Sequence, residues 1–351
     1  MKKPSIFLSM LLASGITLAQ SNNTSDVSQS GSNQDATVEQ SGVNENTSEI
    51  TQTNVGNEAT VTQVSSSQYE DNTTFSSIAQ TGRNNQATVD QNHDGDLEAR
   101  AGSLEAYISQ SGNNNEGIQR QGPNGQMGTS LAIINQSGNN NFASQDQIRY
   151  GNEAQVYQSG NNNEAIQAQD INMQPSDVGS MNNAAIYQSG NNNSALQIQD
   201  GWANGAVAIQ GGSNNTSTQV QKAWVSTAEV NQSGNNNDAS QDQSGSLNDA
   251  SINQFGNSGT AEQVQTSGAG RTGASYDPLN LASIDQWGSD NVAYQEQDTP
   301  GGDIVLNHAI ISQNGSNNMA TQLQNGGSNY SNVMQHGSGH TASVTQSFIQ
   351  P

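Results

Sequence analysis

Hydrophobic and polar residues alternate along this chain around regularly spaced glutamines. The unit Gln-x-Gly-x-x-Asn-x-Ala-x-x-x-Gln can be aligned thirteen times, and in every copy the two glutamines stand eleven residues apart. The Gly position is filled in twelve copies, with Asn54 as the exception. The first glutamines of the units are Gln29, Gln52, Gln80, Gln110, Gln136, Gln158, Gln188, Gln210, Gln232, Gln254, Gln286, Gln313 and Gln335. Biased composition does not hold one spacing over so many copies, so the pattern indicates a repeat protein.

Each unit predicts two short strands. Two residues before the first Gln stands an apolar residue in all thirteen units, and four before either Gln the residue is nearly always Ala, Ser or Gly. Two before the second Gln stands another Gln in nine units, from Gln119 to Gln322. The other four units have Val38, Val61, Val89 and Val344 there. Because alternate residues of a strand share a face, we expect one strand to bury small, apolar and Gln side chains and the returning strand to bury small, Gln and Gln.

The spacing between units shows that two different turns connect these strands. Within a unit the glutamines never vary from eleven apart, whereas between units the distance rises to twenty-one, from Gln265 to Gln286. The added residues include Pro123, Pro175, Pro278 and Pro300. This asymmetry predicts an all-β, two-sheeted β-solenoid of about 13 strand-turn-strand rungs, each of about 22 residues, with insertions confined to one edge.

Stacking of equivalent side chains should stabilise this solenoid. Gly supplies the positive φ of the turn, and Asn can bond the turn backbone and the Asn of the next rung. A buried Gln is costly unless paired, and in-register stacking pairs every Gln with the next. The residues expected to stack are Gln136, Gly138, Asn141, Ala143, Gln147, Gln158, Gly160, Asn163, Ala165, Gln169, Gln188, Gly190, Asn193, Ala195, Gln199, Gln232, Gly234, Asn237, Ala239, Gln243, Ile134, Ile186, Ile252, Ile284 and Ile311.

The two terminal units keep the same pattern as the central ones. Little chain lies outside the units at Gln29 and Gln335 to form a cap over a strand edge. Exposed edges of this kind accept further strands. We therefore expect open-ended, head-to-tail addition of subunits.

The first residues predict export. Lys2 and Lys3 precede an apolar run from Ile6 to Leu18 that is too short to span a bilayer, and Ala19 ends a short run of small residues. This is typical of a secretory signal peptide. The expected division is a signal peptide over 1–19, a short polar leader over 20–26 and the repeat solenoid over 27–351.

Composition narrows the range of partners. The net charge of −23 argues against nucleic acid and anionic membranes as partners. Only 30% of the residues are hydrophobic, which by itself would fit a disordered Asn- and Gln-rich tract. The fixed spacing of the repeat argues against that interpretation.

The repeat unit resembles the curlin repeat of curli fibre subunits, and the likeness runs from about Val27 to Gln346. The resemblance implies a subunit of an extracellular functional amyloid, more like the major subunit than the nucleator. It implies fibres for adhesion in the biofilm matrix at the surface of a Gram-negative bacterium. The implied partners are further copies of the chain, a nucleator subunit, an outer-membrane secretion pore and periplasmic accessory proteins, with no cofactor.

Other functions are compatible with parts of this pattern. A secreted β-solenoid adhesin or matrix protein that does not polymerise shares the same pattern. An enzyme on a β-helix would need converging catalytic groups, but His93 and His308 fall in or near loops and His340 occupies an Asn position. His336, Asp242 and Glu262 also form no pair that spacing can reveal, and Phe255 and Trp287 are expected to point outward. The Asp-bearing nonapeptides of a calcium β-roll and the Thr array of an ice-binding solenoid are missing.

Overall fold

The computed structural model describes residues 22–42, 44–65, 73–93, 102–122, 129–149, 151–170, 181–268, 280–299 and 306–347. In these ranges the chain forms two parallel sheets of thirteen strands each. The odd-numbered sheet consists of β1 Thr24–Ser32, β3 Asn46–Val55, β5 Thr73–Arg83, β7 Ser103–Asn113, β9 Ser130–Asn139, β11 Glu153–Asn161, β13 Asn183–Asn191, β15 Gly205–Ser213, β17 Thr227–Asn235, β19 Asn248–Asn257, β21 Asn280–Ser289, β23 Asn307–Ser316 and β25 Tyr330–Ser338. The even-numbered sheet consists of β2 Asp35–Gly42, β4 Glu58–Ser65, β6 Gln86–His93, β8 Glu116–Gln121, β10 Phe142–Gln147, β12 Glu164–Gln169, β14 Ser194–Gln199, β16 Thr216–Trp224, β18 Asp238–Ser246, β20 Thr260–Ser267, β22 Val292–Thr299, β24 Met319–Asn325 and β26 Thr341–Ser347.

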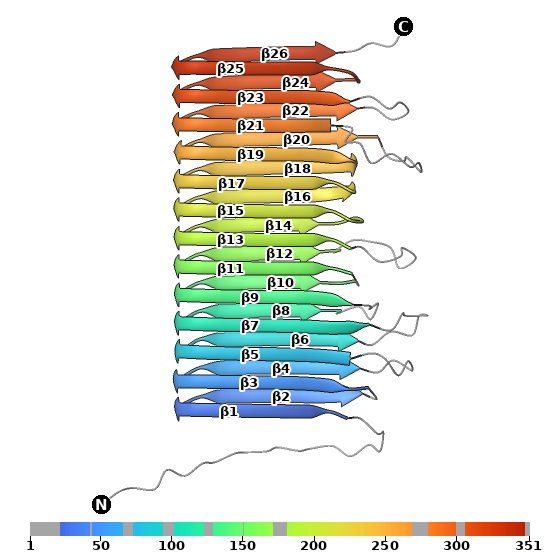
Figure 1. Cartoon of the computed structure of the whole chain (residues 1–351), viewed down its shortest axis with the longest axis vertical. Helices are drawn as coiled ribbons and strands as arrows, with labels where there is room; N and C mark the ends of the chain where they lie inside the picture. The colour runs from blue at the N-terminus through green and yellow to red at the C-terminus, as the bar shows by residue number, and fades with distance from the viewer. Residues whose placement is uncertain are drawn as a thin grey trace, which may run out of the picture.

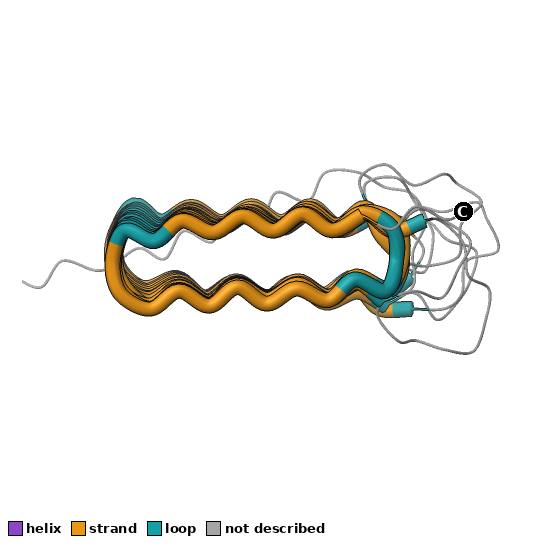
Figure 2. Tube along the Cα trace, turned by 90° about the horizontal axis from the view of Figure 1, so that it is seen from above, coloured by secondary structure: helices purple, strands orange, loops and turns teal. Residues whose placement is uncertain are grey.

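Consecutive strands belong to opposite sheets, and each strand pairs with the strand two further along the chain (Figure 1). We call an odd strand and the even strand that follows it a rung. Seen along the stacking axis, each rung is a flat loop whose two pleated walls face each other, and successive rungs superimpose (Figure 2). The expected all-β solenoid with thirteen two-stranded rungs is therefore confirmed.

Equivalent motif positions pair directly across the rungs. In the odd sheet Gln136 pairs with Gln158 and Gly138 with Gly160, and the same register holds along the whole stack. Such a register brings like side chains into columns about 4.8 Å apart. The spacing of the sequence motif is thus reproduced as columns that run parallel to the stacking axis.

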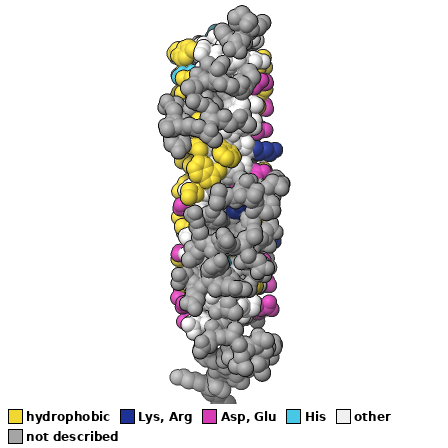
Figure 3. Space-filling model, turned by 90° about the vertical axis from the view of Figure 1, so that its right-hand side faces the viewer, with side chains coloured by type: hydrophobic (Ala, Val, Ile, Leu, Met, Phe, Trp, Pro, Cys, Tyr) yellow, Lys and Arg dark blue, Asp and Glu magenta, His cyan; other side chains and the backbone are white. Residues whose placement is uncertain are grey.

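The solenoid has two unlike edges. We call the edge where an odd strand turns into the even strand of its rung the turn edge, and the opposite edge the insertion edge, which Figure 3 faces. The strands β4, β6, β8, β12, β20 and β22 end at the insertion edge. Pro123, Pro175, Pro278 and Pro300 lie outside the described residues, and so does the expected signal peptide. β1 begins at Thr24, within the segment expected to be a leader.

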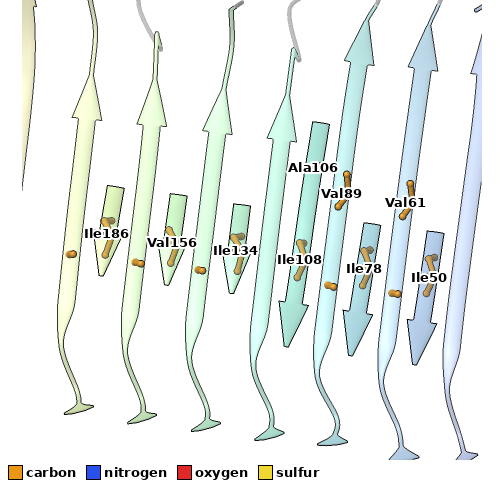
Figure 4. Packing of buried hydrophobic residues seen from close by; sticks show 14 of the residues in the cluster. Ile50, Val61, Ile78, Val89, Ala106, Ile108, Ile134, Val156 and Ile186 are labelled. Carbon is orange, nitrogen blue, oxygen red and sulfur yellow. The ribbon is translucent and has the colours of Figure 1, made fainter. Parts of the chain in front are cut away.

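The interior is a single thin layer between the sheets. Ile134 and Ile186 of the odd sheet are at most 1% exposed and pack beside Ala143 and Ala165 of the even sheet. Side chains of the odd sheet form one row along the axis, which contains Ile50, Ile78, Ile108, Ile134, Val156 and Ile186, and Val61 and Val89 of the even sheet lie beside it (Figure 4). Burying an Ile contributes about 1.5–3 kcal/mol, so each rung has only a small apolar core. The glutamines that fill the rest of the interior must therefore be paired.

Candidate functional site

A ladder of side-chain amides runs through the odd sheet. Each first glutamine, from Gln29 to Gln313, donates from Nε2 to the Oε1 atom of the next rung's glutamine, over 2.7–2.9 Å, until Gln335 is reached. All these bonds have the same direction. The ladder therefore has a donor end at Gln335 and an acceptor end at Gln29.

The same amides also join the two sheets. Gln136 Nε2 donates its second proton to the main-chain oxygen of Glu116 in the even sheet, over 2.9 Å. Gln147, a second glutamine, donates in the opposite direction to the main-chain oxygen of Leu131 in the odd sheet, over 3.0 Å. Because both amide protons are used, these fully buried side chains escape the penalty of an unpaired polar group.

The even sheet carries two further columns. The second glutamines form an unbroken ladder from Gln40 to Gln346, with Nε2 to Oε1 distances of 2.8–3.0 Å. The inner column runs as Gln from Gln119 to Gln322. Where it meets Val89, the Oε1 atom of Gln119 is buried without a hydrogen-bond partner. At its other end Gln322 donates to Ser331 Oγ over 3.0 Å.

Glycine at the turn edge is required by both conformation and space. Gly138 has φ 107°, and a Cβ atom there would lie 2.0 Å from the main-chain oxygen of Gly160 in the next rung. Two residues on, Asn140 takes the left-handed region with φ 55°. In the one unit without the glycine, Asn54 has φ 82° and Gly56 has φ 70°. The two residue types that tolerate positive φ have exchanged places there.

The motif asparagines form a column inside the turn edge. Asn141 Nδ2 donates to the main-chain oxygens of Ser137 and Gly160, over 3.2 and 2.9 Å. Its Oδ1 atom accepts from the main-chain N–H of Asn163, over 3.0 Å. Each such asparagine closes its own turn and binds the turns on both sides, which explains the fixed eleven-residue spacing.

The structure brings the predicted stacking residues together as columns. Their glutamines, asparagines, alanines and isoleucines are at most 2% exposed, and their glycines lie at the turn edge with positive φ. A related column at the insertion edge was not predicted. There Asn204 Nδ2 donates to the main-chain oxygen of Ala223 over 2.8 Å, and Asn204 N–H donates to Asn182 Oδ1. The signal was present in the sequence, because Gln199-x-Gly201-x-x-Asn204 repeats the motif where two units are only eleven residues apart.

The histidines do not gather at one place. His93 ends β6 with a fully buried ring whose nitrogens have no hydrogen-bond partner, and burial lowers its pKa. His308 lies in β23 against the ring of Tyr330. His340 occupies the Asn position, and its main-chain N–H donates to Asn318 Oδ1. Within the described ranges no three His, Asp or Glu side chains are grouped in a way that could hold a metal ion.

The carboxylates lie mainly on the outer faces. Asp242 and Glu262 are exposed, as the alternation predicts. Asp146 occupies a partly buried outward position of β10, next to Arg120 of β8. Burial and the negative charge of Asp90 raise the pKa of the Asp146 carboxyl, and the positive charge of Arg120 acts in the opposite direction. Within the described residues, Asp242, Glu262 and Asp146 thus occupy outward positions of the even sheet.

The two end rungs expose what the inner rungs bury. Every residue of β1 is exposed, including Val27 at 43%, and β26 has only partly buried inward positions. Within the described residues no strand pairs with the outer edges of β1, β2, β25 or β26. These edges present unpaired main-chain groups together with the ends of the glutamine ladders.

Comparison with known families identifies the repeat. Residues 226–256, which include Gln232, Asn237 and Gln243, match the family described as the curlin associated repeat. Over these residues the match supports the resemblance to the curlin repeat. No curated protein matches the chain. Within the described ranges there is no helix of the length and hydrophobicity that a membrane span requires.

Proposed function

Since the chain carries a curlin repeat on a β-solenoid with open ends, we propose that it is a structural subunit of extracellular curli-like amyloid fibres. Subunits add head to tail, so that the first rung of one copy continues the stack of the last rung of another. The observation that carries this proposal is the complementarity of the two end rungs.

The six inward strand positions of the last rung match those of the first rung. The pairs that a head-to-tail junction would stack are Ser331 on Ser25, Val333 on Val27, Gln335 on Gln29, Ala342 on Ala36, Val344 on Val38 and Gln346 on Gln40. The inner column of the even sheet has Val at both ends and Gln in the centre. Stacked subunits would therefore continue the valine column and leave no additional glutamine unpaired.

The direction of the ladders favours the same junction. Gln335 and Gln346 each donate one amide proton to main-chain oxygens, over 2.9 and 2.8 Å, and keep the other for a further rung. At the opposite end, the Oε1 atoms of Gln29 and Gln40 accept nothing from a preceding rung among the described residues. Head-to-tail stacking joins donors to acceptors, whereas stacking two first rungs would oppose acceptor to acceptor.

The remaining parts of the proposal concern location and partners. Export by a signal peptide over 1–19, growth in the biofilm matrix of a Gram-negative bacterium and a role in adhesion fit a structural curlin-repeat subunit. The composition, with a net charge of −23, suits a major-type subunit that stays apart from other copies before assembly. A nucleator subunit, a secretion pore and periplasmic accessory proteins are the proposed partners.

Fibre growth by the purified chain without residues 1–19 tests the proposal. We expect fibres in electron micrographs with a cross-β reflection at about 4.7–4.8 Å. The double variant Gln335→Glu, Gln346→Glu should keep the fold but stop growth, because it opposes carboxylates to the acceptors of Gln29 and Gln40. Met334→Glu with Thr345→Glu, on the outward face of the same strands, is the matched control and should polymerise. A folded wild-type chain that stays monomeric would instead indicate the non-polymerising adhesin.

A further inference from the structure

Two tryptophans stand side by side on the insertion edge, at a position of the turn that asparagine fills in several turns of the turn edge. Trp202 and Trp224 fill the motif position that Asn139 fills at the turn edge, and their ring centroids are 6.4 Å apart. They belong to connections of only eleven residues between glutamines, so the main chain turns here without an insertion. Trp224 is 57% exposed. Figure 3 shows apolar side chains gathered uncovered at this part of the edge.

The residue after each tryptophan has a strained backbone conformation that asparagine would adopt more easily. Ala203 and Val225 have φ 55° and 56°, the left-handed region that Asn140 adopts at the turn edge. A β-branched residue with positive φ is a genuine outlier. Leu247 in the following turn has φ 59°, whereas the corresponding turn near the end of the stack has Ser328. Strain of this kind is a reason to look for function, since a stable turn alone would favour Asn.

The patch formed by Trp202, Ala203, Trp224 and Val225 is framed by charged side chains of both signs. Lys222, two residues before Trp224, is exposed, and Asp200 stands in the preceding turn of the same edge. An apolar surface with a nearby cation and carboxylate can meet a second copy of itself, because each lysine then finds an acidic residue opposite.

We propose that this patch is a lateral contact between two fibres of this protein, an inference that rests on the proposed fibre function. One patch of four side chains is far smaller than the roughly 1,200 Å² that a stable complex buries, so single subunits should not pair through it. A fibre presents the patch once per subunit, at intervals of roughly 60 Å along the axis. Two fibres that align their patches bind at many points together, and each contact after the first costs less.

Cysteine cross-linking tests this contact, because the chain has no cysteine of its own. Ser244→Cys places a thiol beside Lys222 in the next rung and keeps the lysine, and Asp242→Cys places one on the outer face of the even sheet as a control. Within one fibre, equivalent cysteines lie roughly 60 Å apart, beyond the reach of a disulfide. Oxidation of Ser244→Cys fibres should therefore give covalent dimers, and the monomeric subunit and the Asp242→Cys fibres should give few.

A second variant removes the patch and keeps the turn. Trp224→Asn with Val225→Asn copies the residues of the turn edge, so fibres should form normally but appear single in electron micrographs, and Trp287→Ser fibres should pair like the wild type. Single wild-type fibres or paired double-variant fibres would each overturn the lateral contact and leave the fibre function intact. Absence of wild-type fibres would overturn both.

Discussion

Gln136 donates one amide proton to Gln158 in the next rung, over 2.9 Å, and its other proton crosses to the facing sheet. One side chain therefore holds neighbouring rungs and opposite sheets together. Replacing such an amide removes bonds in two directions, which makes the glutamine columns the most sensitive part of the solenoid.

Carboxylates in the inner glutamine column should prevent assembly. Gln197, Gln219 and Gln241 are at most 1% exposed and linked by bonds of 2.8 and 2.9 Å. Changing all three to Glu would stack buried charges about 4.8 Å apart, and each unpaired buried charge costs about 3–5 kcal/mol. We expect no fibres by electron microscopy. Thr218→Glu with Ser240→Glu, on the outward face of the same strands, should assemble, and normal fibres from the triple variant would contradict the buried ladder.

A methyl group at the turn edge should be far more harmful than one inside a strand. In Gly138→Ala the new Cβ would lie 2.0 Å from the oxygen of Gly160, at φ 107°. We expect the free energy of unfolding, measured by urea denaturation, to fall by at least about 1–3 kcal/mol. At Gly205 φ is not positive and the nearest atom to an added Cβ is 3.9 Å away, so Gly205→Ala should gain about 0.4–1 kcal/mol. Equal effects would contradict the close contact between turns.

Removing the strained valine should stabilise the folded chain. Val225 has φ 56°, and most of its counterparts at the turn edge are asparagines. Val225→Asn should raise the free energy of unfolding by about 1–2 kcal/mol, the cost of the left-handed region for an ordinary residue. Asn236→Val, the reverse change at φ 58°, should lower it by a similar amount. An unchanged midpoint in urea for both variants would show that neither turn is strained.

Stability should fall in mild acid because of His93. Burial lowers the pKa of this ring from its ordinary 6.5, so the unfolded chain binds a proton below about pH 6.5 that the folded chain does not. The unfolding free energy should therefore be constant above that pH and decrease as the pH falls through it. The midpoints of urea unfolding, measured from about pH 7.5 to about pH 5.5, test the effect, because this range brackets the ordinary pKa of histidine. His93→Leu should flatten this dependence, whereas His340→Asn, at an exposed ring, should leave it unchanged.

A single inserted residue should act differently at the two kinds of connection. Between Gln188 and Gln199 it would turn the inward residues of β14 outward, because side chains alternate with a period of two. Fibre growth should be lost. An insertion near Gly273, between β20 and β21, lies where the sequence already varies in length and should be tolerated. Equal growth of the two variants, followed by sedimentation, would refute the rung register.

The repeat made most of the fold predictable, but some burial could not be read from it. The alternation around Gln158 and Val156 correctly predicts which side chains enter the interior. His93 continues the alternation two residues beyond Gln91, but the motif ends at that glutamine, so only the length of β6 shows that the His93 ring is buried. The motif also puts Val89 next to Gln119, but only the direction of the amide bonds decides that the Oε1 atom of Gln119 is the one left unpaired.

The sequence by itself determined the strands, their inward faces and the pairing of Gln with Gln, because the side-chain alternation of a strand is local and the spacing of the motif sets the register. The tertiary structure decided three other features: the common direction of the amide bonds from Gln29 to Gln335, the crossing of their second protons to the facing sheet, and the contact of Trp202 with Trp224. An amide can point either way along the stacking axis, and only the position of the donors and acceptors around it in space selects one orientation.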